Sequence, residues 1–499
     1  MDQRGLLTVL KNKQLYGKAP GHELVTSLVN NSKKVQKGSC FIAIKGQQFD
    51  GHSVLDQVIK DGAEMIIVET IPQTLDLTNV VCVKVESTFR TQAILANHYF
   101  NQPTTKLNLV AVTGTNGKTT TSTMISDLLM HLGHKTGLIG TLHYKVDQTY
   151  YPAVNTTPDA YRLQELFAEM VDVGCQDAVI EASSHALALG RISYTDVDCA
   201  IFTNLTREHL DFHQTMDNYA CAKSLLFAHL GQSFKDGRPK LAIINADDPY
   251  GQVMGQATSA ELASYSLEDS NASVYGHSIQ HLDQGLEFTM VYQNQSYRVQ
   301  LPMLGNYNVS NYLAAFLCLA LYYELSVEEI LAATKKFEGV TGRMQMVDEG
   351  QDYQVIVDFA HTPDALENLL KNLSETCKGR LVVMMGHSGG NRDSGMRPDL
   401  GDILFKYADW VVLTADNPRH EDVGKICNEM RRDHSEKDYH IIEDRHEAIQ
   451  YIIDHAQTND TIVFAGKGGE PYQVIGDDYL PFDEIEIVTN LIKKAKGDK

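Results

Sequence analysis

The sequence predicts an α/β protein of three domains, two of which contain mostly parallel sheets. Short apolar runs alternate with helical patterns between residues 108 and 339, and the same alternation restarts after residue 340. This alternation is typical of parallel sheets covered by helices on both faces. A chain of 499 residues is long enough for about two to four domains. We expect an N-terminal domain over 1–107, a central domain over 108–339 and a C-terminal domain over 340–499.

The N-terminal domain is expected to be a small α/β unit. Apolar runs at 40–44, 65–68 and 80–85 predict strands, and residues 54–60 have helical spacing. The turn-forming run NQP at 101–103 predicts a linker before the next strand.

The central domain begins with the most informative stretch of the chain, TGTNGKTT at 113–120. An apolar run at 107–112 precedes it, and a helical pattern follows until Gly133. Strand, glycine loop, Lys-Thr and helix is the order of a phosphate-binding loop, whose backbone N–H groups face anionic oxygens. Lys118 can neutralise the outer phosphates, and the Thr119 hydroxyl can reach Mg²⁺. The loop therefore predicts a nucleoside triphosphate site.

The rest of the central domain should supply the other strands of this sheet. We expect strands at 178–180, 200–202 and 241–244, and a small antiparallel insert within 271–304. Glu181 ends the first of these strands, where its carboxylate could reach the Mg²⁺ of the phosphate loop.

A histidine pair and a lysine follow. His209 and His213 are four residues apart, a spacing that also occurs in zinc sites. Because there is no HExxH arrangement, we favour one functional histidine, His209, and a packing or supporting role for His213. Lys223 lies on a helical pattern among small residues. A buried lysine is costly unless it is paired or neutralised, but the spacing also fits a lysine whose head stays in water.

The C-terminal domain is expected to be a second doubly wound unit without a dinucleotide motif. Strands are expected at 355–357, 381–385, 410–413 and 461–464, and helices at 363–377 and 448–456. Polar loops follow these strands as DFAHTP (358–363), GHSGGNRD (386–393), ADNPR (415–419) and GKGGE (466–470). Loops at the carboxyl ends of parallel strands form a binding crevice.

The residues of these loops indicate an amino-acid ligand. Arg392, Arg419 and Lys467 are local cations in an otherwise acidic chain, and arginine forks suit carboxylates. Asp416 and Glu470 would suit an ammonium group. An amino acid carries both kinds of charge.

Composition excludes several classes of protein. The formal net charge of −21 argues against a nucleic-acid partner. The longest apolar stretch, 313–323, is too short to span a bilayer, and the first residues lack the apolar core of a signal peptide. The eight cysteines are scattered without a CxxC pair, which favours free thiols in a reduced cytoplasm. We expect a cytoplasmic protein that acts as a monomer.

The order of these motifs resembles the Mur ligases of peptidoglycan synthesis, and among them the ligases that add the third residue of the stem peptide. The motifs are TGTNGKTT (113–120), NTTPD (155–159), EASSHAL (181–187), TNLTREHLDFH (203–213), YACAK (219–223), LGNYNVSN (304–311), GRMQ (342–345), DFAHTP (358–363), DNPR (416–419) and GKGGE (466–470). The alternatives are a folylpolyglutamate synthase, which lacks the long N-terminal domain and DNPR, and a nucleotide-dependent switch or inactive scaffold.

The resemblance implies ATP-dependent amide bond formation. A carboxylate of UDP-N-acetylmuramoyl-L-alanyl-D-glutamate would attack the γ-phosphate and become an acyl phosphate, which the amine of an amino acid then displaces. It implies Mg²⁺ as cofactor and CO₂ bound as a carbamate on Lys223 (N6-carboxylysine). The implied catalytic residues are Lys118, Lys223, Glu181 and His209, and the implied metal ligands are Thr119, Glu181, His209 and Lys223.

The resemblance also implies three sets of binding residues. For ATP these are Gly114, Thr115, Asn116, Gly117, Lys118, Thr119, Thr120, Asn306, Arg343, Asp358 and His361. For the UDP-muramoyl dipeptide they are Ser32, Gln47, Gln48, Asn155, Thr156, Thr157, Ser183 and Arg191. For the amino acid they are Arg392, Asp416, Asn417, Pro418, Arg419, Gly466 and Glu470.

The DNPR motif is similar to that of ligases that choose meso-2,6-diaminopimelate, whose distal carboxylate Arg419 would bind. Several residues depart from the family pattern. Asn31 and Lys33 replace the Asp and Arg of a DSR segment, and Gly469 and Pro471 replace His and a non-proline residue beside the selectivity pocket. L-lysine and L-ornithine therefore stay open as alternative amino acids.

Overall fold

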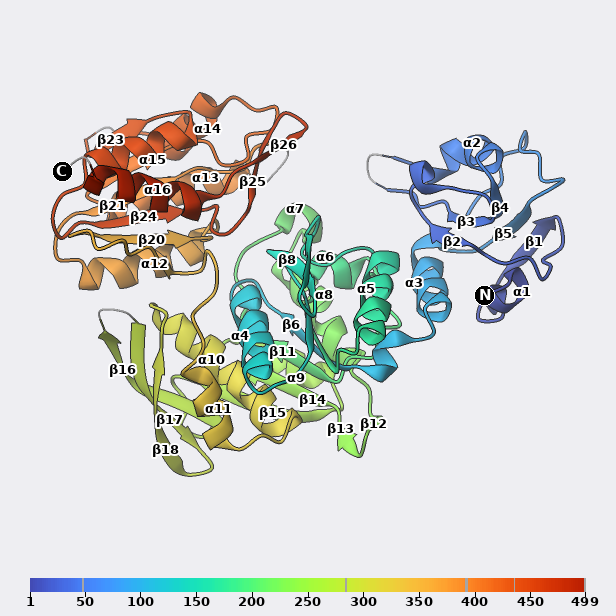
Figure 1. The fold of residues 1–499 in the computed structure, drawn as a ribbon, viewed down its shortest axis with the longest axis horizontal. Coiled ribbons are helices and arrows are strands. Elements are labelled where there is room, and N and C mark those ends of the chain that lie inside the picture. Colours follow the sequence, from blue (N-terminus) through green and yellow to red (C-terminus); the bar gives the residue numbers. More distant parts are fainter. Residues whose placement is uncertain (47–48, 283–284, 391–393, 435, 498–499) are drawn as a thin grey trace.

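The chain folds into three α/β units that follow one another along the sequence (Figure 1). The computed structural model describes residues 1–46, 49–282, 285–390, 394–434 and 436–497. In the view of Figure 1 the N-terminal unit (blue) and the C-terminal unit (orange to red) lie on either side of the central unit. Within the described residues, no helix combines the length and the apolar character needed to cross a bilayer.

The N-terminal unit is one sheet with helices on both faces. Its elements are α1 (Gln3–Leu7), β1 (Gln14–Gly17), β2 (Ser27–Val29), β3 (Ser39–Ile42), α2 (Leu55–Lys60), β4 (Ala63–Val68), β5 (Val81–Lys84) and α3 (Thr88–Tyr99). The described strands pair in the order β1-β5-β4-β3-β2, and only β1 is antiparallel to its neighbour. Successive side chains of β3 point to opposite faces, so Cys40 packs with α1 and α3 while Phe41 packs with α2. The three strands predicted here are confirmed.

The joint between the N-terminal and central units is a helix pair. Helix α3 packs against α5 (Ala160–Asp172) of the central unit. The rings of Phe100 and Tyr161 lie 5.5 Å apart, and the Asn97 side-chain amide donates to the Tyr194 carbonyl at 2.8 Å. The N-terminal unit is thereby held at one end of the central sheet.

The central unit contains a long mixed sheet. Its strands are β6 (Asn108–Thr113), β7 (Thr136–Ile139), β8 (His143–Val146), β9 (Thr149–Pro152), β10 (Asp177–Glu181), β11 (Cys199–Phe202), β14 (Leu241–Asn245), β15 (Glu261–Ser266), β16 (Val274–Leu282), β17 (Gly285–Tyr292) and β18 (Gln295–Leu301). The described strands pair in the order β18-β17-β16-β15-β14-β11-β6-β10-β7-β8-β9. The run from β16 through β11 and β6 to β7 is parallel, and the predicted strands at its centre are confirmed.

The antiparallel insert expected within 271–304 is confirmed, but it is not a separate sheet. Strand β16 pairs in parallel with β15, so β16, β17 and β18 extend the central sheet at its edge. Strands β12 (Phe234–Lys235) and β13 (Arg238–Pro239) form a separate short hairpin.

Helices cover both faces of the central sheet. They are α4 (Lys118–His131), α6 (Ser184–Ala188), α7 (Leu210–His213), α8 (Met216–Ala228), α9 (Gly251–Ala257), α10 (Asn306–Leu317) and α11 (Val327–Thr334), together with α5. Val110 and Val112 of β6 pack with α4 and α10, whereas Leu109 and Ala111 pack with α5 and α8. Both faces of β6 are apolar because both are buried, as expected for a parallel strand.

The C-terminal unit is a second sheet with helices on both faces. Its elements are β19 (Gln345–Met346), β20 (Gln354–Asp358), α12 (Pro363–Thr376), β21 (Leu381–Met385), α13 (Arg397–Tyr407), β22 (Trp410–Leu413), α14 (Val423–Arg431), β23 (Asp438–Ile441), α15 (Arg445–Asp454), β24 (Thr461–Ala465), β25 (Tyr472–Ile475), β26 (Asp478–Pro481) and α16 (Glu484–Gly497). The described strands of the main sheet pair in the order β19-β20-β24-β21-β22-β23, all parallel except β19. The predicted strands and helices of this unit are confirmed, and β19, β23, β25 and β26 were not predicted.

Candidate active site

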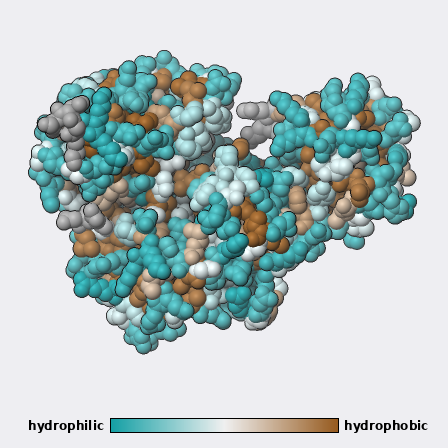
Figure 2. Space-filling view, in the orientation of Figure 1, coloured by the Kyte–Doolittle hydropathy of each residue, from teal (hydrophilic) through white to brown (hydrophobic). Residues whose placement is uncertain are grey.

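One large cavity lies between the central and C-terminal units. It has a volume of about 740 Å³ and is lined by residues of both units. Much of the lining comes from loops that follow the carboxyl ends of β6, β10 and β11 in the central sheet and of β20, β21, β22 and β24 in the C-terminal sheet. Parallel sheets present their ligand sites at this edge. Figure 2 shows the surface hollowed between the units on one face of the molecule.

Most residues predicted for the site line this cavity. They are Thr115, Asn116, Gly117, Lys118, Thr119, Thr120, Asn155, Thr156, Glu181, Ser183, Arg191, His209, Lys223, Arg343, Asp358, His361, Asp416, Asn417, Arg419, Gly466 and Glu470. Gly114, Thr157, Asn306 and Pro418 are not among its lining residues. Ser32 lies in a short 3₁₀ helix of the N-terminal unit, and Gln47, Gln48 and Arg392 lie outside the described residues.

The phosphate-binding loop joins β6 to α4. Gly117 precedes the helix with φ of 85°, in the left-handed region that favours glycine. A Cβ atom at this position would lie 2.3 Å from the Asn311 side-chain oxygen of α10. Glycine is therefore required both for the turn and for the close approach of Asn311, a residue that the sequence analysis did not single out.

Two lysine ammonium groups converge on one carbonyl oxygen of this loop. The Gly114 carbonyl accepts from Lys118 Nζ at 2.9 Å and from Lys223 Nζ at 2.7 Å. Lys223 is buried, with 1% of its surface exposed, and its ammonium lies 4.6 Å from the centre of the Tyr219 ring. Burial lowers the pKa of both lysines, and the charge of Lys118 lowers the pKa of Lys223 further. The surface location that the spacing also allowed for Lys223 is therefore wrong.

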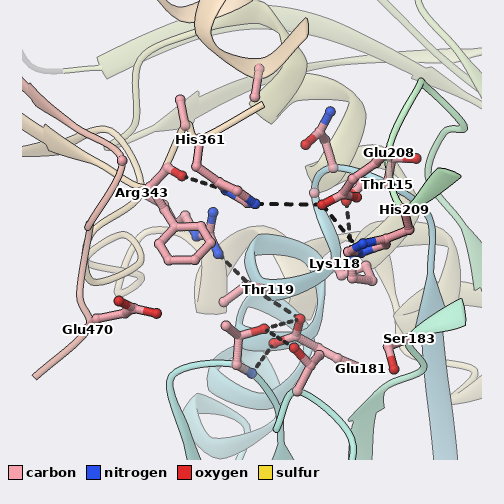
Figure 3. Close-up of a pocket in the computed structure, with 18 of the residues that line it drawn as sticks. Thr115, Lys118, Thr119, Glu181, Ser183, Glu208, His209, Arg343, His361 and Glu470 are labelled. Carbon is pink, nitrogen blue, oxygen red and sulfur yellow. Dashed lines mark hydrogen bonds and ion pairs between the residues drawn. The ribbon is translucent and has the colours of Figure 1, made fainter. Parts of the chain in front are cut away.

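Glu181 is the centre of a second cluster below the loop (Figure 3). Its carboxylate accepts from the Thr119 hydroxyl at 3.0 Å and from the Thr141 backbone N–H and hydroxyl at 2.8 and 3.0 Å. Arg343, which lies before the C-terminal sheet, donates from Nη2 to the Thr119 hydroxyl at 3.1 Å. The Arg343 guanidinium also lies 4.3 Å from the centre of the Phe359 ring. An arginine of the interdomain segment therefore already contacts the phosphate loop.

Further contacts join the two units across the cavity. The carboxylate of Glu208 lies 3.4 Å from His209 Nε2 and 3.6 Å from His361 Nε2 (Figure 3). The Asn116 side-chain amide donates to Asp364 of α12 at 3.0 Å. The sequence analysis missed Glu208, although it directly precedes His209 within the NLTREHLDFH segment. Adjacency in the motif was the only available signal.

His209 and His213 differ in their surroundings. His209 has φ of 56°, and 34% of its side chain is exposed. Partial burial lowers the pKa of His209 to about 4, so its imidazole is neutral near pH 7. His213 is buried and shares a hydrogen bond with the Ser184 hydroxyl at 2.9 Å. This environment agrees with the packing or supporting role predicted for His213.

The segment 155–157 is tied to the strand that ends in Glu181. The Thr157 hydroxyl donates to the Glu181 carbonyl at 2.6 Å, and Arg191 Nη1 donates to the Thr157 carbonyl at 3.0 Å. Thr157 is fully buried behind the cavity wall. Thr157 does not line the cavity, whereas Thr156 and Ser183 do.

The C-terminal crevice contains a buried ion cluster. Lys467 has no exposed surface, and its ammonium lies 3.5 Å from Asp416 Oδ1 and 3.3 Å from Glu470 Oε2. Burial opposes ionisation of Asp416, but Lys467 and Arg445 outweigh it and lower the Asp416 pKa. Lys467 is thus the counterion of two acids that were predicted to face the ligand. It is not the cation offered to the ligand that the sequence suggested.

Arg419 differs from Lys467 in having no acidic partner among the described residues. Its Nε atom is buried without a hydrogen-bond partner, and its side chain lies against Gly390. A Cβ atom on Gly390 would lie 2.5 Å from Arg419 Cδ, and Gly390 has φ of 67°. The guanidinium therefore lines the cavity with donors left for a ligand.

The predicted metal ligands fall into two places. Glu181 lies beside Thr119, whereas His209 lies with Glu208 near Lys223. Among the described residues, no group of three or more His, Cys, Asp and Glu side chains is arranged to hold a metal ion. Any ion here would depend on oxygen ligands such as the Thr119 hydroxyl, the Glu181 carboxylate and the ligand itself, which is the donor set that suits Mg²⁺.

Three family descriptions match the chain. Residues 112–319 match the Mur ligase middle domain, residues 342–468 match the Mur ligase glutamate ligase domain, and residues 24–99 match the Mur ligase family catalytic domain. A UDP-N-acetylmuramoyl-L-alanyl-D-glutamate--2,6-diaminopimelate ligase of Bacillus cereus is 42% identical and covers 94% of both chains. A protein of the same name from Bacillus licheniformis is 41% identical over 98% of this chain and 99% of its own length.

Solved structures share this fold. The structure of a UDP-N-acetylmuramoyl-L-alanyl-D-glutamate--2,6-diaminopimelate ligase has a TM-score of 0.65 at 32% identity and 95% coverage of both chains. MurF from Acinetobacter baumannii has a TM-score of 0.68 at 20% identity, with 99% of this chain and 98% of that chain covered. The latter similarity concerns the fold alone.

Proposed function

The chain belongs to the Mur ligase family, and from this membership we propose that it adds meso-2,6-diaminopimelate to UDP-N-acetylmuramoyl-L-alanyl-D-glutamate at the expense of ATP. The observation that supports this function most directly is a single cavity with a phosphate-binding loop at one end and an arginine without an acidic partner at the other. ATP and an amino acid with an additional carboxylate match these two ends.

The nucleotide end is suited to a triphosphate and Mg²⁺. The N-terminus of α4 and Lys118 would bind the phosphates, with Asn306, Arg343, Asp358 and His361 around the nucleotide. Thr119 and Glu181 provide adjacent oxygen ligands, joined at 3.0 Å, and His209 provides a neutral imidazole. A bound Mg²⁺ would neutralise phosphate charge.

Lys223 is suited to carbamylation. Its lowered pKa favours the neutral amine, whose nitrogen can bond to the carbon of CO₂ and release one proton to solvent. The product is a carbamate anion beside Lys118, so the two lysine side chains that meet at the Gly114 carbonyl would become an ion pair. The carbamate would also offer oxygen ligands to Mg²⁺.

The chemistry requires the substrates to meet near the phosphate loop. The γ-carboxylate of the dipeptide would attack the γ-phosphorus of ATP and release ADP, forming an acyl phosphate. The amine of the incoming amino acid would then attack the acyl carbon, and inorganic phosphate would leave. Asn155, Thr156, Ser183 and Arg191 would hold the dipeptide, and positioning with charge neutralisation would supply most of the catalysis.

The remaining binding roles belong to the same proposal. Ser32, with Gln47 and Gln48, would contact the uridine, and Asp416, Asn417, Gly466 and Glu470 would bind the amino-acid end of diaminopimelate. ATP and a UDP-linked precursor, together with eight free cysteines, favour a cytoplasmic reaction.

Arg419 favours diaminopimelate over L-lysine and L-ornithine. The distal carboxylate of diaminopimelate would satisfy the buried Arg419 Nε donor, whereas the side-chain ammonium of L-lysine would face a like charge. The departure at Gly469 has a packing reason, because a Cβ atom there would lie 3.1 Å from Thr341 Cγ2. Gly469 does not line the cavity, so its substitution leaves this preference in place.

The proposal is tested by phosphate release from ATP with the UDP-linked dipeptide and each of the three amino acids. We expect release with meso-diaminopimelate and little with L-lysine or L-ornithine. Arg419→Ala should raise the KM for diaminopimelate on the order of a hundredfold, because a charge-assisted pair is lost. The control is Arg432→Ala, which removes an exposed arginine paired with Asp402. Efficient use of L-lysine by the wild-type chain, or an unchanged KM in Arg419→Ala, would contradict the proposal.

A further inference from the structure

A short hairpin places two tyrosines on the wall of the cavity beside Arg419. Strands β25 and β26 pair antiparallel directly after the Lys467–Glu470 cluster. The rings of Tyr472 and Tyr479 lie 5.1 Å apart at an interplanar angle of 60°, and both residues line the cavity. Tyr479 keeps 60% of its surface exposed. Because Tyr479 lines the cavity and keeps exposed surface, its ring offers a broad apolar contact to a ligand there.

The hairpin is fastened to the loop that carries Arg419. The Arg419 N–H donates to the Val474 carbonyl at 3.1 Å, and the Gly476 N–H donates to the Arg419 carbonyl at 2.8 Å. The Asn417 side-chain oxygen accepts from the Val474 N–H at 2.9 Å, and the Gln473 amide donates to the Asp416 carbonyl at 2.8 Å. These bonds fix the register between hairpin and loop.

This fastening also explains the backbone of Arg419, which has φ of 55°. A non-glycine residue in the left-handed region carries a conformational cost and persists only where its neighbours determine it. Hydrogen bonds from the Arg419 N–H and to its carbonyl hold the backbone in this conformation. The backbone of Arg419 and that of the hairpin are therefore held in one fixed register.

We propose that Tyr479, supported by Tyr472, forms the wall that contacts the aliphatic chain of the incoming diamino acid and so helps to select its length. This inference rests on the proposed function. Asp416 and Glu470 define one end of the amino-acid site, and Arg419 defines the other. An amino acid that spans both ends exposes the methylene groups between them, and these groups need an apolar surface. Tyr479 lies on the same cavity wall.

The alternative is that Tyr479 only stabilises the hairpin through its stacking with Tyr472. The two roles differ in what they change. A contact with the aliphatic chain affects the KM for the amino acid and the discrimination between chain lengths, whereas hairpin stacking affects folding. Tyr479→Phe keeps the ring and should behave as the wild type under both roles, so Tyr479→Ala carries the test.

The experiment measures kcat and the KM of all three substrates for the full-length wild type, Tyr479→Ala, Tyr479→Phe and Tyr150→Ala. Tyr150 is a matched control, because it is 58% exposed on the hairpin strand β9 and does not line the cavity. We expect Tyr479→Ala to raise the KM for meso-diaminopimelate about tenfold, with the KM for ATP within about twofold of wild type. Preference for diaminopimelate over the homologue shorter by one methylene group should weaken in Tyr479→Ala alone.

A binding measurement separates this inference from the proposed function. Saturation-transfer NMR with the wild type detects which ligand protons lie near protein side chains without requiring turnover. We expect strong transfer to the methylene protons of the amino acid that the enzyme uses, reduced in Tyr479→Ala and retained in Tyr479→Phe. If the wild type uses L-lysine instead, the proposed substrate fails while the wall is still tested with L-lysine. Equal transfer in wild type and Tyr479→Ala, or an unchanged KM, would overturn the inference.

Discussion

The two sheet edges that face the cavity differ in whether their buried lysines have acidic partners. At the central sheet, Lys118 and Lys223 share the Gly114 carbonyl, and no acidic oxygen lies within 4 Å of either ammonium among the described residues. At the C-terminal sheet, Lys467 contacts both Asp416 and Glu470. One edge leaves its cations without counterions, and the other neutralises them within the protein.

This difference indicates what each edge requires from its ligands. Buried cations without counterions favour anions from outside, so the central edge suits phosphates and the carbamate that we propose. At the C-terminal edge Lys467 is already paired with two carboxylates, and the guanidinium of Arg419 is left without an acidic partner among the described residues. The first arrangement gives strong but general attraction for anions. The second gives selectivity, because one donor group at a fixed place discriminates between ligands.

The largest expected effect concerns the unbalanced edge. Lys223→Ala removes one of the two ammonium groups and the site of the proposed carbamate. We expect kcat to fall on the order of a thousandfold, as when a positioned electrostatic group is removed from an active site. Formate or acetate should restore part of the activity by supplying a carboxylate in the space left by the side chain. The measurement is phosphate release with all substrates present.

Lys135→Ala is the control for this experiment. Lys135 belongs to the same unit, but 51% of its side chain is exposed and it pairs with Asp147 at 3.2 Å. Its removal should leave kcat unchanged. Activity of Lys223→Ala within a few fold of wild type would mean that the convergence of two lysines on Gly114 has no catalytic purpose, and the contrast between the two edges would lose its functional meaning.

The second-largest effect concerns the C-terminal sheet edge, where Lys467 is paired with acids, and should appear as a change in the free energy of unfolding. Arg445 and Glu484 form an ion pair with no exposed side-chain surface, at 2.8 Å between Nη2 and Oε2. Arg445 also donates to the carbonyls of Ala415 and Ala465, at 3.0 and 3.2 Å. Arg445→Met should lower the free energy of unfolding by about 3–5 kcal/mol, because it leaves the Glu484 carboxylate buried without a partner.

Denaturant unfolding followed by tryptophan fluorescence measures this effect in the C-terminal unit, which contains the ion pair. Trp410 is the only tryptophan of the chain and lies buried in β22 of the C-terminal sheet. The double variant Arg445→Met with Glu484→Leu should recover most of the lost stability, since no charge is then left unpaired. The double variant should still raise the KM for the amino acid, because the Ala415 and Ala465 carbonyls lose their donor. Equal stability of the single and double variants would mean that the unpaired Glu484 carboxylate does not cause the loss of stability.

The sequence was most informative where local order determines structure. The phosphate loop, the apolar parallel strands and the helix starts follow from patterns within a few residues, such as Val110 and Val112 packing on one face of β6. The parallel strands at the centre of both large sheets could therefore be predicted. The extension of the central sheet by β16 could not, because the choice of a pairing partner depends on contacts between distant segments.

The candidate site was predictable only in part, for the same reason. Lys467 is a cation next to a glycine turn in the sequence, and only the fold shows that Asp416, 51 residues earlier by the printed numbering, already neutralises it. Glu208 was overlooked because its link to His361 crosses the interface between two units. The β25–β26 hairpin was not predicted because Tyr479 follows a short, polar turn segment whose residues do not show a strand pattern. Charge balance in a folded site is a property of distant pairs.

The smallest expected effect is a pH dependence at the balanced edge. His387 lines the cavity with 5% of its surface exposed, and Arg397 Nε donates to its Nδ1 at 3.4 Å. Burial, followed by the charge of Arg397, lowers the His387 pKa to about 4. The unfolded chain, with a histidine pKa of about 6.5, binds one more proton than the folded chain between these two values. Stability from this histidine is therefore present above pH of about 6.5 and is lost as the pH falls towards about 4.

Substituting this histidine should remove its share of the pH dependence. In His387→Asn the side-chain oxygen can still accept from Arg397, but nothing titrates. We expect the slope of unfolding free energy against pH to fall by up to about 1.4 kcal/mol per pH unit between pH of about 4.5 and 6. Trp410 fluorescence in denaturant measures the slope, and His446→Asn, which removes an exposed histidine of the same unit, is the control. An unchanged slope would mean that His387 carries a proton in the folded protein, so this edge would hold an unbalanced positive charge after all.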